Sequence, residues 1–242
     1  MASKIRQGKN QVSLARALSK LGVASRSQSA DLIREGKVSV DGRIVNKPDV
    51  WVDPKHEKIT VDQRVIRKKA LVYLAFNKPC GIVTTRKDEL GRRTVFDFLP
   101  EENQCVFPVG RLDKETCGLL LFTNDTKFGE RITNPKTKIA KVYDVVLNRP
   151  VQDADREMMN RTMVLKDGTS LKPARLGSVG RDPLRVQVTI EEGKNRQVRR
   201  MFEHFGYSVV WLQRLRIGSI DLGRLEEGKT RPLTVAEIKS IG

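Results

Sequence analysis

The segment at residues 110–125, GRLDKETCGLLLFTND, contains the residue best suited to chemistry, Asp113. Arg111 and Lys114 stand beside this aspartate. A glycine suited to a turn precedes it, and an apolar run suited to a buried strand follows. Nearby cations favour the charged form of a carboxylate, so we expect Asp113 to be ionised and able to act as a base or a nucleophile. Taken alone, however, an aspartate between basic residues is more often part of a surface ion pair.

The cysteines and histidines do not indicate a metal site. Cys80, Cys105 and Cys117 are too few and too scattered for a disulfide framework, and neither they nor His56 and His204 have the spacing of metal ligands. We therefore expect reduced thiols, as in a cytoplasmic protein. No apolar run has the length of a signal-peptide core or a membrane span, so no membrane association is expected.

The chain is strongly basic along its whole length. It has 46 Lys and Arg against 29 Asp and Glu, a net charge of +17 in 242 residues. Residues 1–69 hold 16 basic and 7 acidic side chains, so +9 of the excess lies there and +8 in the remainder. Solubility alone is normally served by a smaller charge. The composition therefore predicts a polyanionic partner, a nucleic acid, that both parts of the chain contact.

Two short helices are expected at the start of a module spanning residues 12–66. Each has apolar residues at helical spacing and a glycine at its end. The first is marked by Leu14, Leu18, Leu21 and Gly22. The second is expected to begin after Ser25 and end at Gly36, and to bury Ala30 and Ile33.

A hairpin is predicted to follow these helices. Residues 37–45 alternate apolar and polar side chains around Asp41-Gly42, a pair typical of a two-residue turn. Trp51 is expected in a loop, and residues 58–61 in a further strand. The basic residues that flank the helices and hairpin, and that would hold an RNA backbone, are Arg26, Arg34, Lys37 and Arg43.

The domain organisation is predicted from these shifts in composition. Residues 1–11 are polar and basic, and are interpreted as a disordered arm. Residues 12–66 form the small α/β module, residues 67–70 a basic linker, and residues 71–242 a larger α+β domain with a mixed or antiparallel sheet.

The larger domain is expected to contain several apolar strands and one amphipathic helix. The strands are predicted at residues 71–76, 119–122, 141–147, 184–190, 209–212 and 217–222. The helix is predicted to begin after Asn195 as N-cap and to end at Gly206. Its buried face would consist of Val198, Met201, Phe202 and Phe205.

Four stretches of the larger domain resemble, in order, the motifs of RsuA-like pseudouridine synthases. They are NKPCGIVTT at 77–85, GRLDKETCGLLLFTND at 110–125, KVYDVVL at 141–147 and EEGKNRQVRRMF at 191–202. Residues 17–45, ALSKLGVASRSQSADLIREGKVSVDGRIV, resemble the S4 RNA-binding domain that precedes the catalytic domain in this family. The resemblance extends over residues 12–239.

The resemblance implies that the protein isomerises uridine to pseudouridine without a cofactor. Asp113 matches the catalytic aspartate. Arg199 matches an arginine expected to hold Asp113 ionised through a charge-assisted bond. Tyr143 matches the tyrosine that stacks on the flipped uracil, although a core tyrosine on a Val-rich strand is a reasonable alternative. Arg111 matches an arginine that would fill the stack vacated by the base.

Other site residues and partners are less closely defined. Asn77, Lys78 and Lys194 are weaker candidates for RNA-backbone contacts. The expected partner is structured ribosomal RNA or a ribosome assembly intermediate, bound by a monomer, with large-subunit RNA slightly favoured. Two other function classes remain open. One is a non-catalytic RNA-binding protein of ribosome assembly, and the other is an N-glycosidase that would release free base.

Overall fold

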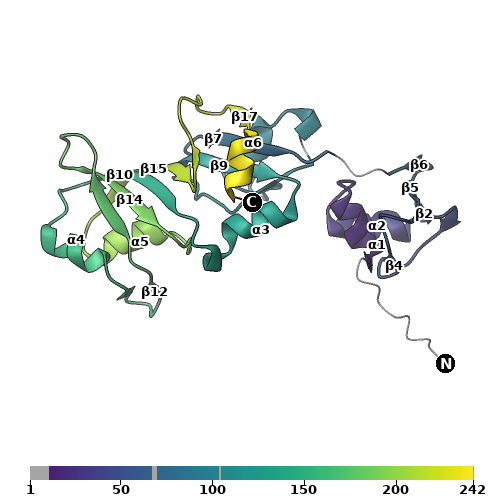
Figure 1. Cartoon of the computed structure of the whole chain (residues 1–242), viewed down its shortest axis with the longest axis horizontal. Coiled ribbons are helices and arrows are strands. Elements are labelled where there is room, and N and C mark those ends of the chain that lie inside the picture. Colours follow the sequence, from purple (N-terminus) through teal and green to yellow (C-terminus); the bar gives the residue numbers. More distant parts are fainter. Residues whose placement is uncertain (1–10, 67–69, 104, 242) are drawn as a thin grey trace. The chain divides into compact units, whose positions relative to one another are not determined.

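The computed structural model describes residues 11–66, 70–103 and 105–241. Contacts divide the chain into two compact units, one ending at Leu71 and the other beginning at Val72 (Figure 1). The expected basic arm, apart from residue 11, and the expected linker, apart from residue 70, lie outside the described residues. None of the helices in the described part of the chain is long and apolar enough to cross a bilayer.

The first unit places two helices against small antiparallel sheets. Its elements are β1 (Val12–Ser13), α1 (Leu14–Lys20), α2 (Arg26–Arg34), β2 (Val38–Val40), β3 (Arg43–Ile44), β4 (Trp51–Val52), β5 (Ile59–Val61) and β6 (Arg64–Val65). Ser25 begins α2 as predicted, because its side chain and that of Gln28 form a reciprocal capping box. Ile33 is buried as expected, but the buried neighbour on this face is Ser29, and Ala30 is only half-buried.

The hairpin at residues 38–44 is confirmed. Asp41 and Gly42 both have positive φ, as the predicted two-residue turn requires. The loop expected at Trp51 is wrong, because Trp51 and Val52 form a strand that pairs with β1. The sequence offered no signal for this pairing, since it depends on a partner about 40 residues away.

The second unit is built on one nine-stranded mixed sheet of order β13-β14-β10-β15-β9-β7-β17, with β16 beside β15 and β8 beside β9. Its strands are β7 (Tyr73–Lys78), β8 (Phe107–Pro108), β9 (Cys117–Thr123), β10 (Lys141–Leu147), β13 (Arg175–Ser178), β14 (Arg185–Ile190), β15 (Val209–Ile217), β16 (Ile220–Asp221) and β17 (Thr230–Pro232). Among the described residues only the β9–β15 pairing of this sheet is parallel, so of the two sheets expected, mixed or antiparallel, the mixed one is observed.

Four α-helices and a separate hairpin complete this unit. They are α3 (Thr126–Thr133), α4 (Asp153–Met159), α5 (Gln197–His204) and α6 (Val235–Ile241), with β11 (Met163–Val164) and β12 (Ser170–Leu171); short 3-10 segments are Val95–Phe98, Glu101–Asn103 and Pro135–Thr137. Figure 1 shows α4 and α5 beside the β10–β14 end of the sheet, and α3 and α6 beside the β7–β9 end.

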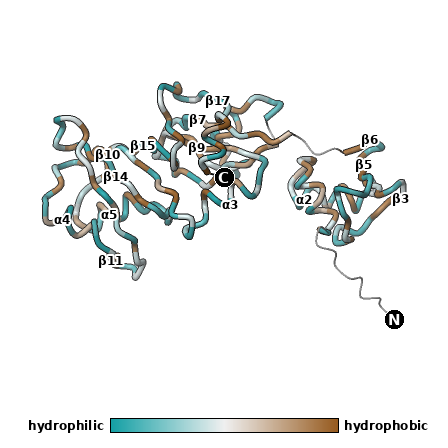
Figure 2. Tube along the Cα trace, in the orientation of Figure 1, coloured by the Kyte–Doolittle hydropathy of each residue, from teal (hydrophilic) through white to brown (hydrophobic). Residues whose placement is uncertain are grey.

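Strand β9 is apolar except at its last residue, Thr123, because both of its faces are covered. All seven of its residues are buried. Leu119 and Leu121 pack with Phe128 and Ile132 of α3, whereas Leu120 and other alternate residues pack against the opposite cluster around the first 3-10 segment. Figure 2 shows the hydrophobic residues gathered along β7 and β9. This rigid strand begins directly after the segment that carries Asp113.

Several boundaries differ from the predictions. The strand predicted at 209–212 continues as β15 to Ile217, because the residues that follow it still pair with β10. The strand predicted at 217–222 is the short β16, which pairs with the end of β15. Helix α5 is preceded by Arg196 as N-cap, not by Asn195, and Phe205 is its C-cap residue. Arg196 has φ +48, a left-handed conformation that residue-type preferences do not predict.

Candidate active site

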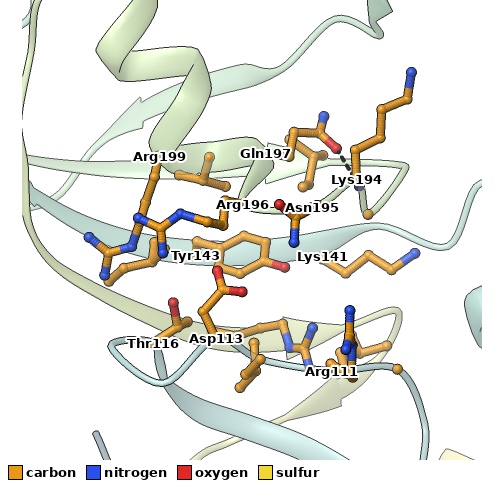
Figure 3. A pocket seen from close by; sticks show the side chains of 18 of the residues that line it. Arg111, Asp113, Thr116, Lys141, Tyr143, Lys194, Asn195, Arg196, Gln197 and Arg199 are labelled. Atoms are coloured by element: carbon orange, nitrogen blue, oxygen red, sulfur yellow. Dashed lines mark hydrogen bonds between the residues drawn. The ribbon is translucent and has the colours of Figure 1, made fainter. Parts of the chain in front are cut away.

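A cavity of about 340 Å³ opens in the second unit, where the 110–116 loop, β10, β15 and the start of α5 meet. Among the described residues that line it, Asp113 is the single carboxylate. The cations that line it are Arg111, Lys141, Lys194, Arg196, Arg199 and Arg214. Figure 3 shows most of these side chains around the Asp113 carboxylate. This excess of positive charge suits a polyanionic ligand.

Asp113 is held by its backbone, while its carboxylate is left available. Thr84 bridges to Leu112 next to it, with Oγ1 donating to the Leu112 carbonyl at 2.8 Å, and the Thr116 amide donates to the Asp113 carbonyl at 3.1 Å. Within the described residues, the Asp113 side chain has no ion-pair partner within 4 Å and no hydrogen bond. Figure 3 shows it directed toward the Tyr143 ring. A partly buried carboxylate of this kind is free to react with a ligand.

Lys78 supports this loop from inside the protein. Its side chain is fully buried, and its Nζ donates to the carbonyls of Pro79 at 3.0 Å, Thr116 at 2.9 Å and Lys114 at 3.4 Å. Burial lowers the pKa of Lys78 to about 8. The expected contact of Lys78 with the RNA backbone is therefore wrong, because no phosphate can reach this ammonium group without unfolding the loop.

Asn77 is also turned into the protein. It is 7% exposed, and its Nδ2 donates to the carbonyl of Leu225 at 2.8 Å. Its expected RNA contact is wrong for the same reason. Both residues end strand β7, whose neighbours β9 and β17 cover it on either side.

Tyr143 lies on β10 with 7% of its surface exposed. It lines the cavity and also belongs to the hydrophobic cluster of β10, β14 and α5. Tyr143 is therefore a core residue that also borders the cavity, and its stacking on a flipped base stays a prediction. In Figure 3 the ring lies directly beside Asp113.

Arg199 projects from α5 and is 8% exposed. The charge-assisted bond expected between Arg199 and Asp113 is not formed in this structure. Instead, Nη2 donates to the carbonyl of Glu115 at 3.0 Å and Nη1 to that of Val209 at 3.0 Å. Arg199, which belongs to α5, thus links the backbone of Glu115, two residues after Asp113, to the backbone of Val209 on β15. Its Nε has no acceptor in the described part of the chain.

The exposed cations stand at the rim of the cavity. Arg111 and Lys194 lie there, and their contacts with RNA stay predictions; Arg111 also borders a second, shallower groove formed by the loop at residues 83–92. Arg196 was missed by sequence reasoning, and it pairs with Glu115 at 3.4 Å. Arg200, by contrast, turns outward and pairs with Asp167.

The basic residues of the first unit are exposed but not equivalent. Arg34 pairs with Asp31 at 2.8 Å, and Lys37 pairs with Glu35 at 2.7 Å. Within the described residues, neither Arg26 nor Arg43 has a carboxylate within 4 Å. These two are therefore the stronger candidates for RNA-backbone contacts, because they do not have to give up an ion pair.

The role of Tyr143 can be tested by two substitutions. Tyr143→Phe keeps the aromatic face and is expected to keep RNA affinity. Any loss of rate then measures the contribution of the Tyr143 hydroxyl group to turnover. Tyr143→Leu removes the aromatic face and is expected to make the binding free energy of the flipped base less favourable by about 1–3 kcal/mol. Single-turnover rates and RNA affinities check this, with thermal melting as a control for core packing. Wild-type turnover by both variants would leave Tyr143 as a core residue only.

Comparison with known proteins places these residues in context. The sequence profile of the family described as RNA pseudouridylate synthase matches residues 72–204, and that of the S4 domain matches residues 12–58. The ribosomal large subunit pseudouridine synthase B of Bacillus subtilis is 36% identical over 94% of both chains. An uncharacterized RNA pseudouridine synthase of Aquifex aeolicus is 35% identical over 96% of this chain and 94% of its own.

A solved structure agrees with these sequence similarities. The crystal structure of a pseudouridylate synthase superposes with a TM-score of 0.71 at 32% identity, and the match covers 96% of this chain and all of the other. The similarity therefore extends over both units and includes the cavity with Asp113.

Proposed function

This chain belongs to the RNA pseudouridylate synthase family, and from that premise we propose that it converts a uridine of ribosomal RNA to pseudouridine with Asp113 as its catalytic carboxylate. The observation that carries the residue assignment is the cavity itself. It has one carboxylate, an aromatic ring beside it, and six cations around them.

The chemistry requires little beyond these groups. The bond between N1 and C1′ breaks, the uracil turns, and a new bond joins C5 to C1′, so there is no net redox change. Asp113 either attacks C1′ or removes the proton from C2′, and both roles need an ionised carboxylate close to the sugar. Tyr143 would offer a flat face for the flipped base, and Arg111, which is exposed, would occupy the vacated stack.

Large-subunit RNA is the proposed substrate. The Bacillus subtilis relative is named for the large ribosomal subunit and aligns over 94% of both chains. The S4 unit in front of the catalytic unit supports a structured RNA, because it adds a second basic surface.

The function is tested with ribosomal RNA that carries tritium at C5 of uridine. Release of tritium to water with no free base is expected. Free uracil would instead indicate an N-glycosidase, and tight binding without either product would indicate a binding protein. Mapping pseudouridines in both ribosomal RNAs from a strain without this gene identifies the subunit, and a missing modification confined to small-subunit RNA would contradict the large-subunit proposal.

The contribution of the S4 unit to RNA binding is tested by charge. Replacing Arg26 and Arg43 by Gln is expected to lower the slope of log affinity against log salt by about 1.4–1.8, as two lost phosphate contacts require. The matched pair Arg34→Gln and Lys37→Gln is expected to change the slope less, because both cations already face a carboxylate. The maximal rate on saturating RNA should change less than the affinity. An unchanged slope in the Arg26 and Arg43 variant would show that this surface does not meet the backbone.

A further inference from the structure

Two buried cations, Arg214 on β15 and Lys141 on β10, line the same cavity as Tyr143 and have no acidic partner among the described residues. They are 6% and 8% exposed, respectively. In the described part of the chain neither has a carboxylate within 4 Å. A buried charge without a counter-charge is costly, so its presence in a ligand cavity points to a negative charge supplied by the ligand.

The register of the sheet places both cations around Tyr143. Arg214 is the residue directly opposite Tyr143 in the β10–β15 pairing, and Lys141 lies two residues before Tyr143 on β10. Because side chains two apart on a strand and directly opposite across a pair share a face, all three face the same side of the sheet. The burial of Lys141 and the charge of Arg214 together lower the pKa of Lys141, which indicates that the two cations lie within electrostatic reach of each other.

Arg214 is held rigidly but leaves a donor unused. Its Nε donates to the carbonyl of Leu119 at 2.7 Å, which fixes the plane of the guanidinium group. Its buried Nη2 has no acceptor among the described residues. A hydrogen-bond donor that is already oriented and has no acceptor can stabilise negative charge that develops on a bound ligand during a reaction. The protein does not have to rearrange for this, so the stabilisation carries no reorganisation cost.

The part of the target nucleotide that meets this pair is the base. The phosphates stay on the RNA strand, near the cavity mouth, where the exposed cations Arg111, Lys194 and Arg196 stand. A uracil stacked on Tyr143 would bring its edge to the residues beside that ring. Uracil is neutral when it arrives, but it becomes an anion once it is detached from the sugar.

We propose that Arg214, assisted by Lys141, stabilises the negative charge that uracil acquires when the N1–C1′ bond breaks. The bonding electron pair leaves with N1 and spreads onto the two carbonyl oxygens, while C1′ gains a bond to Asp113 or C2′ loses a proton to it. The uracil anion then supplies the electron pair of the new C5–C1′ bond. In the first case the bond between C1′ and Asp113 breaks and its electron pair returns to the carboxylate, and in the second case C2′ takes its proton back from Asp113. C5 finally loses its proton and N1 gains one, which leaves a neutral base. This inference rests on the proposed function.

The test compares two bases that differ in how well they carry the negative charge. Fluorine at C5 makes the uracil anion intrinsically more stable, so 5-fluorouridine depends less on help from the protein. Arg214→Met in the full-length protein is expected to lower the single-turnover loss of uridine about 100-fold or more, with RNA affinity within about threefold of wild type. The same variant is expected to consume 5-fluorouridine in RNA at a rate within about tenfold of wild type. For both bases the rate measured is the loss of the starting nucleoside, because C5 of 5-fluorouracil carries no proton to release after the new bond forms.

A control and a second variant keep the outcome interpretable. Arg216→Met changes an exposed arginine two residues along the same strand, and is expected to lower both rates less than about threefold. If Arg214→Met does not fold, Lys141→Met serves in its place. It is also expected to lower the rate on uridine more than the rate on 5-fluorouridine, but with a smaller loss on uridine than Arg214→Met.

Two outcomes would overturn this inference alone, and a third would overturn the proposed function with it. Equal losses on uridine and 5-fluorouridine would assign Arg214 a structural role. A loss of RNA affinity with an unchanged rate would indicate that Arg214 and Lys141 bind a phosphate of the RNA and not the base. A wild-type protein that forms no pseudouridine would remove the proposed function, and this inference with it, whereas the first two results would leave the proposed function intact.

Discussion

Asp113→Asn is expected to lower the single-turnover rate of pseudouridine formation by about 10³-fold or more, with RNA affinity within about threefold of wild type. The amide keeps the shape of the side chain but can neither attack C1′ nor accept a proton. Binding should survive because the cations that meet the RNA are unchanged and the Asp113 side chain makes no bond that holds the described structure together. Tritium release from C5 and a filter-binding titration measure the two quantities.

The matched control is Glu115→Gln in the same loop. The Glu115 side chain is exposed and pairs with Arg196, whereas the bond that Arg199 makes goes to the Glu115 backbone carbonyl and is kept. This variant is expected to stay within about threefold of the wild-type rate. Activity of Asp113→Asn within tenfold of wild type would end the assignment of Asp113.

Gly118→Ala is expected to lower the free energy of unfolding of the second unit by about 4 kcal/mol, and its melting temperature by about 10 °C. Gly118 has φ +96, and a Cβ there would lie 2.4 Å from the backbone oxygen of Arg214. That contact lies in the parallel β9–β15 pairing, which joins the two halves of the sheet. Because the obstacle is backbone, it cannot move aside without opening the sheet.

Substitutions at two other glycines separate the two causes of this loss of stability, the backbone strain at a positive φ and the contact of the added Cβ. Gly168→Ala has a similarly positive φ but open space around the new atom, so it is expected to cost only about 1 kcal/mol of backbone strain. Gly177→Ala lies on strand β13 without a positive φ and is expected to change stability by less than about 0.5 kcal/mol. Thermal melting of all three checks the order. A Gly118 variant no less stable than the Gly168 variant would show that the sheet halves are not joined as described.

Elements with strong local patterns could be predicted from the sequence. Strand β10 has the predicted bounds, because its Val-rich run is buried on both sides. The turn at Asp41-Gly42 and the cap at Ser25 were also predicted, since each depends on residues within a few positions of one another. The pairing of Trp51 and the continuity of β15 were not predicted, because each is set by a partner strand far along the chain.

The site divides in the same way. The resemblance of the sequence motifs to a known family indicated Asp113, Tyr143 and Arg199, and the fold brings these three to one cavity. The burial of Lys78 and Arg214 appears only in the tertiary structure. Lys78 binds the carbonyls of residues 36 and 38 positions away, and Arg214 binds that of a residue 95 positions away. From the sequence alone, a basic side chain is predicted to be exposed and to face the RNA. The groups that accept its hydrogen bonds and exclude water from it are far away in the sequence, and they come together only when the chain folds.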